Sequence, residues 1–143
     1  MRIKEMMSKD IASCTPEASL HECAQLMKDH DCGMIPIVEG NGQMKPVGTI
    51  TDRDIVCRAV AEGKNPLEMK AHEVMSKNPV TINLNDEHED AIELMEDNQI
   101  RRLIVVNDNG ECQGVLSQAD LALNAPEDEV AEVVQQVSRP TMH

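Results

Sequence analysis

Apolar and polar positions follow the same order of patterns twice along the chain. In the first half, apolar residues spaced three or four positions apart over 20–27 predict a helix, and an apolar run at 34–38 predicts a strand. The second half repeats these two patterns at 91–95 and 103–106. A chain that carries one pattern of elements twice is expected to fold as two similar units.

Each copy contains further elements around this helix and strand. Asn-Gly dipeptides at 41–42 and 109–110 predict hairpin turns after the strands. Each copy is also expected to contain an extended segment, a second strand and a second helix. In the first copy these lie at 12–14, at 47–50 and from Thr51 onward. In the second copy they lie at 80–82, at 114–116 and from Ser117 onward. The order in each copy is therefore β-α-β-β-α, and two copies favour a unit with pseudo-twofold symmetry over a solenoid.

The spacing of the copies predicts where the chain divides. The turn-rich stretch 62–66 is expected to connect the copies, so repeat 1 spans 1–66 and repeat 2 spans 67–125. Residues 126–143 are expected to form a C-terminal helix and tail. Pro126 suits the first helical position and the acidic residues 127–129 suit the positive helix start, while valines provide the apolar face.

Composition narrows the function classes. The formal net charge of −13 and the absence of Phe, Tyr and Trp disfavour nucleic-acid binding, which needs basic surfaces and often aromatic stacking. No apolar run approaches the roughly 20 residues that cross a bilayer, and no secretory signal is visible, so the expected location is the cytoplasm. The five cysteines include no CxxC pair, which argues against a disulfide framework or a zinc ribbon.

The motif Gly-x-x-[Thr/Ser]-x-x-Asp occurs once in each copy, at 48–54 and 114–120. A helix start exposes unpaired N–H groups that attract phosphate, and a hydroxyl at that place adds a donor. The aspartate one turn later is suited to accept hydrogen bonds from ribose hydroxyls. The alternative is a capping box, which uses the same residue types and needs no ligand.

These pieces together resemble the tandem CBS-domain family, also called Bateman modules. The matching stretches are 48–54, 74–81, 102–106 and 114–120, and the resemblance covers about residues 3–123. It is strongest to short stand-alone bacterial members of the hypoxic-response type. The resemblance implies an α+β fold in which two repeats pack through their sheets with pseudo-twofold symmetry and leave two clefts.

The resemblance also implies what the clefts bind. In the family they hold AMP, ADP, ATP, S-adenosylmethionine or related ligands as regulators and not as catalytic cofactors. One cleft is expected to combine Thr49, Thr51 and Asp54 with Val80, Thr81, Ile100, Arg101 and Arg102. The other is expected to combine Val115, Ser117 and Asp120 with Ala12, Ser13, Cys32, Gly33 and Met34.

Other functions find less support in the sequence. His21 with Cys23, and His30 with Cys32, suggest a metal site, but residues two apart on a helix point to opposite sides, so no metal is expected. The same geometry separates the carboxylates of Asp52 and Asp54, and no ordered Cys/His/acid set is present, so no enzyme is expected. A module for dimerisation or scaffolding that binds no ligand remains the alternative.

The expected partners follow from the family resemblance. CBS pairs commonly associate through their helices, so a homodimer is expected. No effector domain accompanies the repeats in this sequence, so the regulated target is expected to be a separate, unknown protein. No nucleic-acid or membrane partner is expected.

Overall fold

The chain forms two compact units with a sheet in each. The computed structural model describes residues 1–9 and 12–140, so Asp10 of the first repeat and the end of the predicted tail lie outside the described residues. One unit contains 12–79 with 110–112, and the other contains the described parts of 1–11, 80–109 and 113–143. None of the described helices is both long and apolar enough to cross a membrane.

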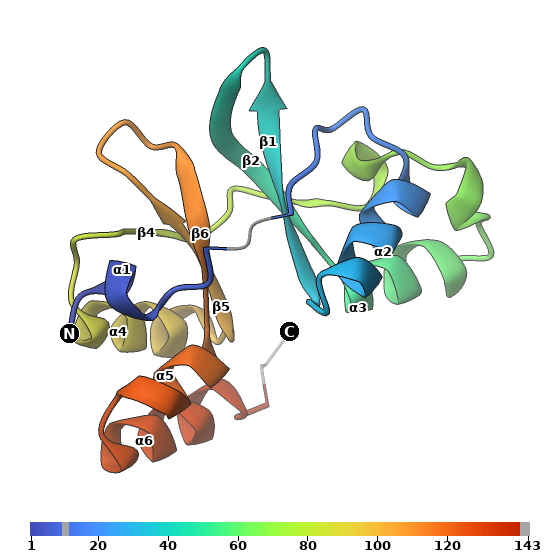
Figure 1. Cartoon of the computed structure of the whole chain (residues 1–143). Helices are drawn as coiled ribbons and strands as arrows, with labels where there is room; N and C mark the ends of the chain where they lie inside the picture. Colours follow the sequence, from blue (N-terminus) through green and yellow to red (C-terminus); the bar gives the residue numbers. More distant parts are fainter. Residues whose placement is uncertain (10–11, 141–143) are drawn as a thin grey trace. The chain divides into compact units, whose positions relative to one another are not determined.

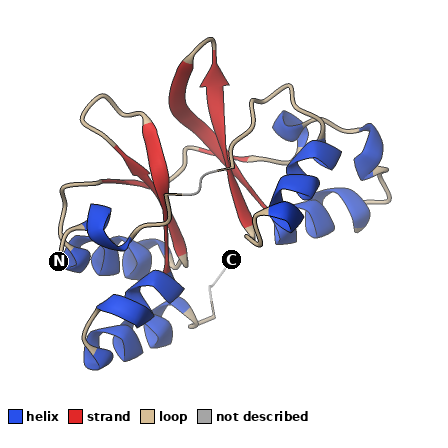
Figure 2. Ribbon diagram, viewed as in Figure 1, coloured by secondary structure: helices blue, strands red, loops and turns tan. Residues whose placement is uncertain are grey.

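The unit built from 12–79 holds a three-stranded sheet in the order β1-β2-β3. Its helices gather on one side of this sheet (Figure 2). Its elements are α2 (Leu20–Asp29), β1 (Met34–Gly40), β2 (Gln43–Thr51), α3 (Asp52–Ile55), the π-helical turn η1 (Val56–Val60), the 3₁₀ turns η2 (Pro66–Glu68) and η3 (Ala71–Glu73), and β3 (Ser76–Lys77).

The first predicted hairpin is confirmed. Strands β1 and β2 pair antiparallel, with Gly40 opposite Gln43, which leaves Asn41 and Gly42 as the two-residue loop. Their φ angles are 58° and 77°, the left-handed pair that a type I′ turn requires and that Asn-Gly adopts at least cost. The turn therefore fixes the register of the strand that leads into Thr51.

The predicted helix and extended segment before this hairpin are also confirmed. Helix α2 begins after Ser19, whose hydroxyl accepts a hydrogen bond from the backbone N–H of Glu22. Its face with Leu20, Cys23 and Met27 is buried in the core of the unit. Ahead of it, Cys14 bridges to β1 in parallel and adds backbone hydrogen bonds along that strand.

The other unit has a second three-stranded sheet, in the order β4-β5-β6, with β4 and β5 parallel. Figure 1 shows its helices labelled α1 and α4 to α6. Its elements are α1 (Ile3–Met6), β4 (Thr81–Asn83), α4 (His88–Asn98), β5 (Arg102–Val106), β6 (Cys112–Ser117), α5 (Gln118–Asn124) and α6 (Glu127–Val137).

Two details differ from the sequence-based expectation in this unit. Only Gly110 of the second Asn-Gly dipeptide has a left-handed φ, and the residues 107–111 form a longer loop. The side-chain oxygen of Asn107 accepts a hydrogen bond from the Asn109 N–H, which stabilises a different turn. Pro126 is the N-cap of α6 and not its first helical residue, because its ψ of 141° is extended.

The C-terminal helix belongs to the core of its unit. Val133 on α6 is fully buried, and the helix packs against α4 and α5. This packing brings acidic side chains together. The pKa of the Glu96 carboxyl is raised, mainly by burial and to a smaller extent by the negative charges of Glu132 and Asp97. The buried Oε1 of Glu96 has no hydrogen-bond partner within the described part of the chain.

The segment that opens each sequence repeat pairs with the other repeat's strand. Ser8 bridges antiparallel to Val115 of β6, and Ser76 of β3 pairs with Thr49 of β2. Each compact unit therefore contains the opening segment of one sequence repeat and the hairpin strands of the other repeat. The repeated Met-Ser-Lys sequence at 7–9 and 75–77 is thus explained by its strand pairing.

This pairing requires the glycine that begins each motif. A Cβ on Gly114 would lie 2.4 Å from the backbone oxygen of Ser8, and one on Gly48 would lie 2.7 Å from that of Ser76. Both distances are shorter than real Cβ contacts, and backbone atoms cannot rotate away. The glycines are therefore needed for close approach of two strands, whether or not a ligand binds.

We expect Gly114→Ala to lower the free energy of unfolding by about 2–3 kcal/mol, because the added methyl overpacks a strand pair. Gly63→Ala is the control: Gly63 has a φ of 76° but nothing within 4 Å of its Cβ position, so only backbone strain of about 1 kcal/mol is expected. Urea unfolding followed by circular dichroism measures both, since the chain has no Trp or Tyr. An equal loss in the two variants would contradict the close-approach explanation.

Candidate functional site

Each repeated motif forms a reciprocal cap at a strand-to-helix junction. Thr51 ends β2 in an extended conformation, its hydroxyl oxygen accepts from the Asp54 N–H at 3.0 Å, and Asp54 Oδ2 accepts from the Thr51 N–H at 3.0 Å. The second motif repeats this arrangement, with distances of 3.2 Å to Ser117 Oγ and 2.9 Å to Asp120 Oδ2. The capping box weighed as an alternative is therefore present in both repeats.

The caps leave bonding capacity for a ligand. In each cap the Thr or Ser oxygen acts as an acceptor, so its O–H hydrogen is still able to donate. One carboxylate oxygen of the aspartate is used by the cap, and a carboxylate has two oxygens that accept. Asp54 has a side chain 15% exposed, so it is partly buried and still accessible. Capping and nucleotide binding are therefore compatible on the same residues.

The turn from helix to first strand lies beside the motif of its own repeat. The Gly33 carbonyl accepts from the Asp52 N–H at 3.2 Å, and Met34 pairs with Thr51. In the second repeat the Arg101 carbonyl accepts from the Gln118 N–H at 2.8 Å. The equivalent turns therefore each bring a backbone carbonyl to the start of the motif helix, that of Gly33 in one repeat and that of Arg101 in the other.

The remaining residues predicted for the clefts are divided between the two units. Ala12, Ser13 and Cys32 belong to the unit that contains the Thr51 motif. The unit with the Ser117 motif contains Val80, Thr81, Ile100 and Arg102. Since each predicted cleft combines residues of both units, these combinations stay predictions.

Sequence reasoning missed Arg58, which contacts the first motif. Its Nη2 lies 3.7 Å from Asp54 Oδ1, and its Nη1 donates to the Val74 carbonyl and to Ser76 Oγ. The signal was present in the sequence as an Asp/Arg pair four residues apart on a predicted helix. The pair lies at the motif itself.

A hollow of about 370 Å³ lies within the unit formed mainly by 12–79. Only Ser13 of the predicted site residues lines it. Beside it, Cys14 and Cys23 share a thiol hydrogen bond in the core. This bond, with burial, raises the pKa of Cys23, while the same bond lowers the pKa of Cys14 against the opposing effect of burial. The hollow does not contain Thr51 or Asp54.

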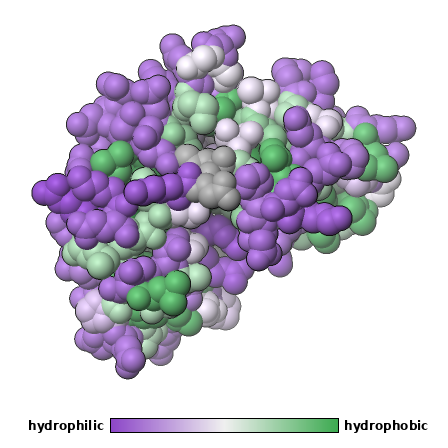
Figure 3. Space-filling model, in the orientation of Figure 1, coloured by the Kyte–Doolittle hydropathy of each residue, from purple (hydrophilic) through white to green (hydrophobic). Residues whose placement is uncertain are grey.

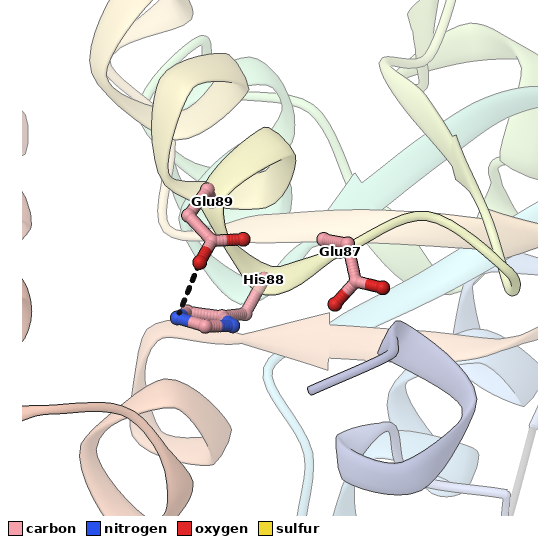
Figure 4. A group of neighbouring side chains, drawn as sticks. All are labelled: Glu87, His88 and Glu89. Carbon is pink, nitrogen blue, oxygen red and sulfur yellow. Dashed lines mark ion pairs between the residues drawn. The ribbon is translucent and has the colours of Figure 1, made fainter.

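The residues considered for metal binding are arranged differently from the sequence suggestion. His21 is exposed while Cys23 is buried, so the two do not share a face. Among the described residues, ligand-type atoms gather instead at Glu87, His88 and Glu89, all within 4.8 Å of one another (Figure 4).

The His88 imidazole already has protein partners on both nitrogens. Its Nε2 lies 3.0 Å from Glu129 Oε2 and 3.4 Å from Glu89 Oε1, and its Nδ1 lies 3.3 Å from the Met1 amine. These contacts join the first residue, α4 and α6 of one unit. These polar contacts therefore hold separate segments of that unit together.

Comparison with protein families identifies a repeated domain. The family described as the CBS domain matches residues 3–60 and, a second time, residues 71–127. The two matches together cover most of the chain, and each ends just after a motif and its helix.

Curated relatives share this arrangement. The chain is 38% identical to the CBS domain-containing protein YhcV of Bacillus subtilis, over 99% of this chain and 98% of YhcV. It is 27% identical to Hypoxic response protein 1 of Mycobacterium tuberculosis, over 96% of this chain and 94% of that protein.

Solved structures of similar chains carry adenosine compounds. CBS domain protein PAE2072 from Pyrobaculum aerophilum, complexed with AMP, superposes with a TM-score of 0.80 at 29% identity, over 94% of this chain and 99% of that one. The CBS domain pair of protein MJ0100, in complex with 5′-methylthioadenosine and S-adenosyl-L-methionine, has a TM-score of 0.75 at 26% identity, over 86% of this chain and 98% of that one.

Proposed function

Because the chain belongs to the CBS domain family and contains two tandem copies of the domain, we propose that it is a regulatory protein that binds an adenosine-type ligand. The ligand is an adenine nucleotide or S-adenosylmethionine, the chemistry found with PAE2072 and MJ0100. Binding changes the interaction with a separate protein partner.

The observation that carries this proposal is the duplicated cap. Both Thr51 and Ser117 present a hydroxyl at a helix start, and in both cases an aspartate is held one turn further on. A hydroxyl and the backbone N–H groups of a helix start suit a phosphate, and an aspartate carboxylate suits the ribose diol. This geometry supports the ligand-binding roles that we propose for Thr51, Ser117, Asp54 and Asp120.

The base and the remaining contacts come from the other predicted residues. Thr49 and Val115, each two positions before the hydroxyl residue, are proposed to line the adenine. The opposite repeat is proposed to complete each pocket as the family pattern implies.

A dimerisation or scaffold module is the second candidate. It is favoured by the capping boxes, which explain the Thr/Ser and Asp residues without a ligand. Catalysis is not proposed, because binding and positioning explain the motif residues.

Adenine nucleotide is expected to raise the melting temperature of the wild-type protein. At about 100 times the dissociation constant, one site stabilises the folded state by about 2.7 kcal/mol, a shift of roughly 5–10 °C for a chain of this length. The variant with Asp54→Ala and Asp120→Ala is expected to lose this shift, because the ribose is no longer held. Circular dichroism with AMP, ATP and S-adenosylmethionine measures it.

The same variant separates the two candidate functions. Loss of the caps alone lowers the free energy of unfolding by about 1 kcal/mol for each aspartate, and this loss lowers the ligand-free melting temperature. Under the scaffold hypothesis this loss occurs and no ligand moves the wild-type melt. An equal ligand shift in wild type and variant would show that the ligand binds elsewhere.

A homodimer is proposed as the functional state. Exposed apolar side chains lie on the helical parts of both units: Val56 and Val60 on η1 are 56% and 55% exposed, and Leu123 on α5 is 83% exposed. Figure 3 shows hydrophobic residues gathered over α5, with further hydrophobic residues elsewhere on the same face. Association through helices would bury such side chains.

Sedimentation equilibrium at micromolar concentration is expected to give twice the chain mass of 15.8 kDa. The variant with Val60→Glu and Leu123→Glu is expected to shift the equilibrium toward the monomer, since a carboxylate is costly to bury in an apolar interface. Lys64→Glu, a charge change at an exposed position just after η1, is the control and is expected to leave the dimer intact. A wild-type protein that sediments at 15.8 kDa would contradict the proposal.

A further inference from the structure

The Arg58 guanidinium is fixed on both of its sides. Its Nη1 donates to the Val74 carbonyl at 2.9 Å and to Ser76 Oγ at 3.1 Å. Its Nη2 lies 3.7 Å from Asp54 Oδ1. A planar guanidinium held by two groups on one nitrogen presents the other nitrogen in a fixed direction. Arg58 is therefore anchored beside Asp54 although its side chain is 48% exposed.

This contact engages the carboxylate oxygen that the cap does not use. Asp54 Oδ2 accepts from the Thr51 N–H, and Oδ1 faces Arg58. The negative charge of Asp54 would repel a phosphate bound at the start of α3. A guanidinium 3.7 Å away offsets that repulsion and keeps the carboxylate oriented.

The second repeat lacks this arrangement. The residue four positions after Asp120 is Asn124, and its Nδ2 donates to the backbone carbonyl of Asp120 at 2.8 Å, not to the carboxylate. Within the described parts of the chain, Asp120 has no ion-pair partner. The two motifs thus have the same type of cap, but they differ in whether a charged side chain lies beside the aspartate.

We propose that Arg58 is a positioning residue that makes the two nucleotide sites unequal, so that the Asp54 site selects phosphorylated adenosine ligands over uncharged ones. This inference rests on the proposed function and adds a specificity to one of its sites. Arg58 acts through Asp54: it orients the carboxylate for the ribose and compensates its charge for the phosphate. The Asp120 site has no such compensation from its own helix.

The test compares the affinities for AMP and for adenosine at one site at a time. In the Asp120→Ala background, isothermal titration calorimetry is expected to show that Arg58→Asn lowers the preference for AMP over adenosine about tenfold, the size of one lost charge-assisted contact. Arg58→Lys retains the charge and is expected to restore most of this preference. A loss of fold alone would weaken both ligands together, so the ratio of affinities separates the two effects.

The reciprocal variant is the matched control. In the Asp54→Ala background, Asn124→Arg places a guanidinium one turn after Asp120, and it is expected to raise the preference of that site for AMP. An unchanged ratio in Arg58→Asn, with affinities lowered equally or not at all, would overturn the inference and leave the proposed function standing. Wild-type protein that binds neither ligand at millimolar concentration would overturn the proposed function itself.

Discussion

The reciprocal cap between a hydroxyl residue and an aspartate is the interaction on which this molecule depends. It ends a strand and starts a helix at the same residue, Thr51 in one unit and Ser117 in the other. The strand is placed by its close approach to Ser76 or Ser8, which only a glycine permits. The cap then fixes where the helix N–H groups and the aspartate point. Fold and candidate site therefore share one constraint.

Much of this arrangement could be predicted from the sequence because it is local. The Asn41-Gly42 turn, helix α2 and the caps each depend on residues a few positions apart, so the periodicity and turn chemistry were sufficient. The second turn differs from the prediction because the Asn107 side chain accepts a hydrogen bond from the Asn109 N–H and so stabilises another loop conformation. The exchange of the first segments was not predicted, because the pairing of Ser8 with Val115 joins residues far apart in the chain.

For the candidate site, the sequence pattern correctly placed Thr51 and Ser117 at the starts of helices, while the contact of Arg58 with Asp54 was overlooked among the surface charges. A salt bridge with an exposed partner contributes little stability in general, and its interest here comes from its position at Asp54. Two repeats with the same cap and different neighbouring charges suggest one binding chemistry with two specificities.

If an adenosine ligand binds at these caps, amide chemical shifts report its binding at the site itself. In a two-dimensional ¹H–¹⁵N NMR titration with AMP, we expect the largest shifts at the amides that begin α3 and α5, namely Asp52 to Asp54 and Gln118 to Asp120. Shifts confined to residues around the hollow beside Cys14, or no shifts at millimolar AMP, would contradict it.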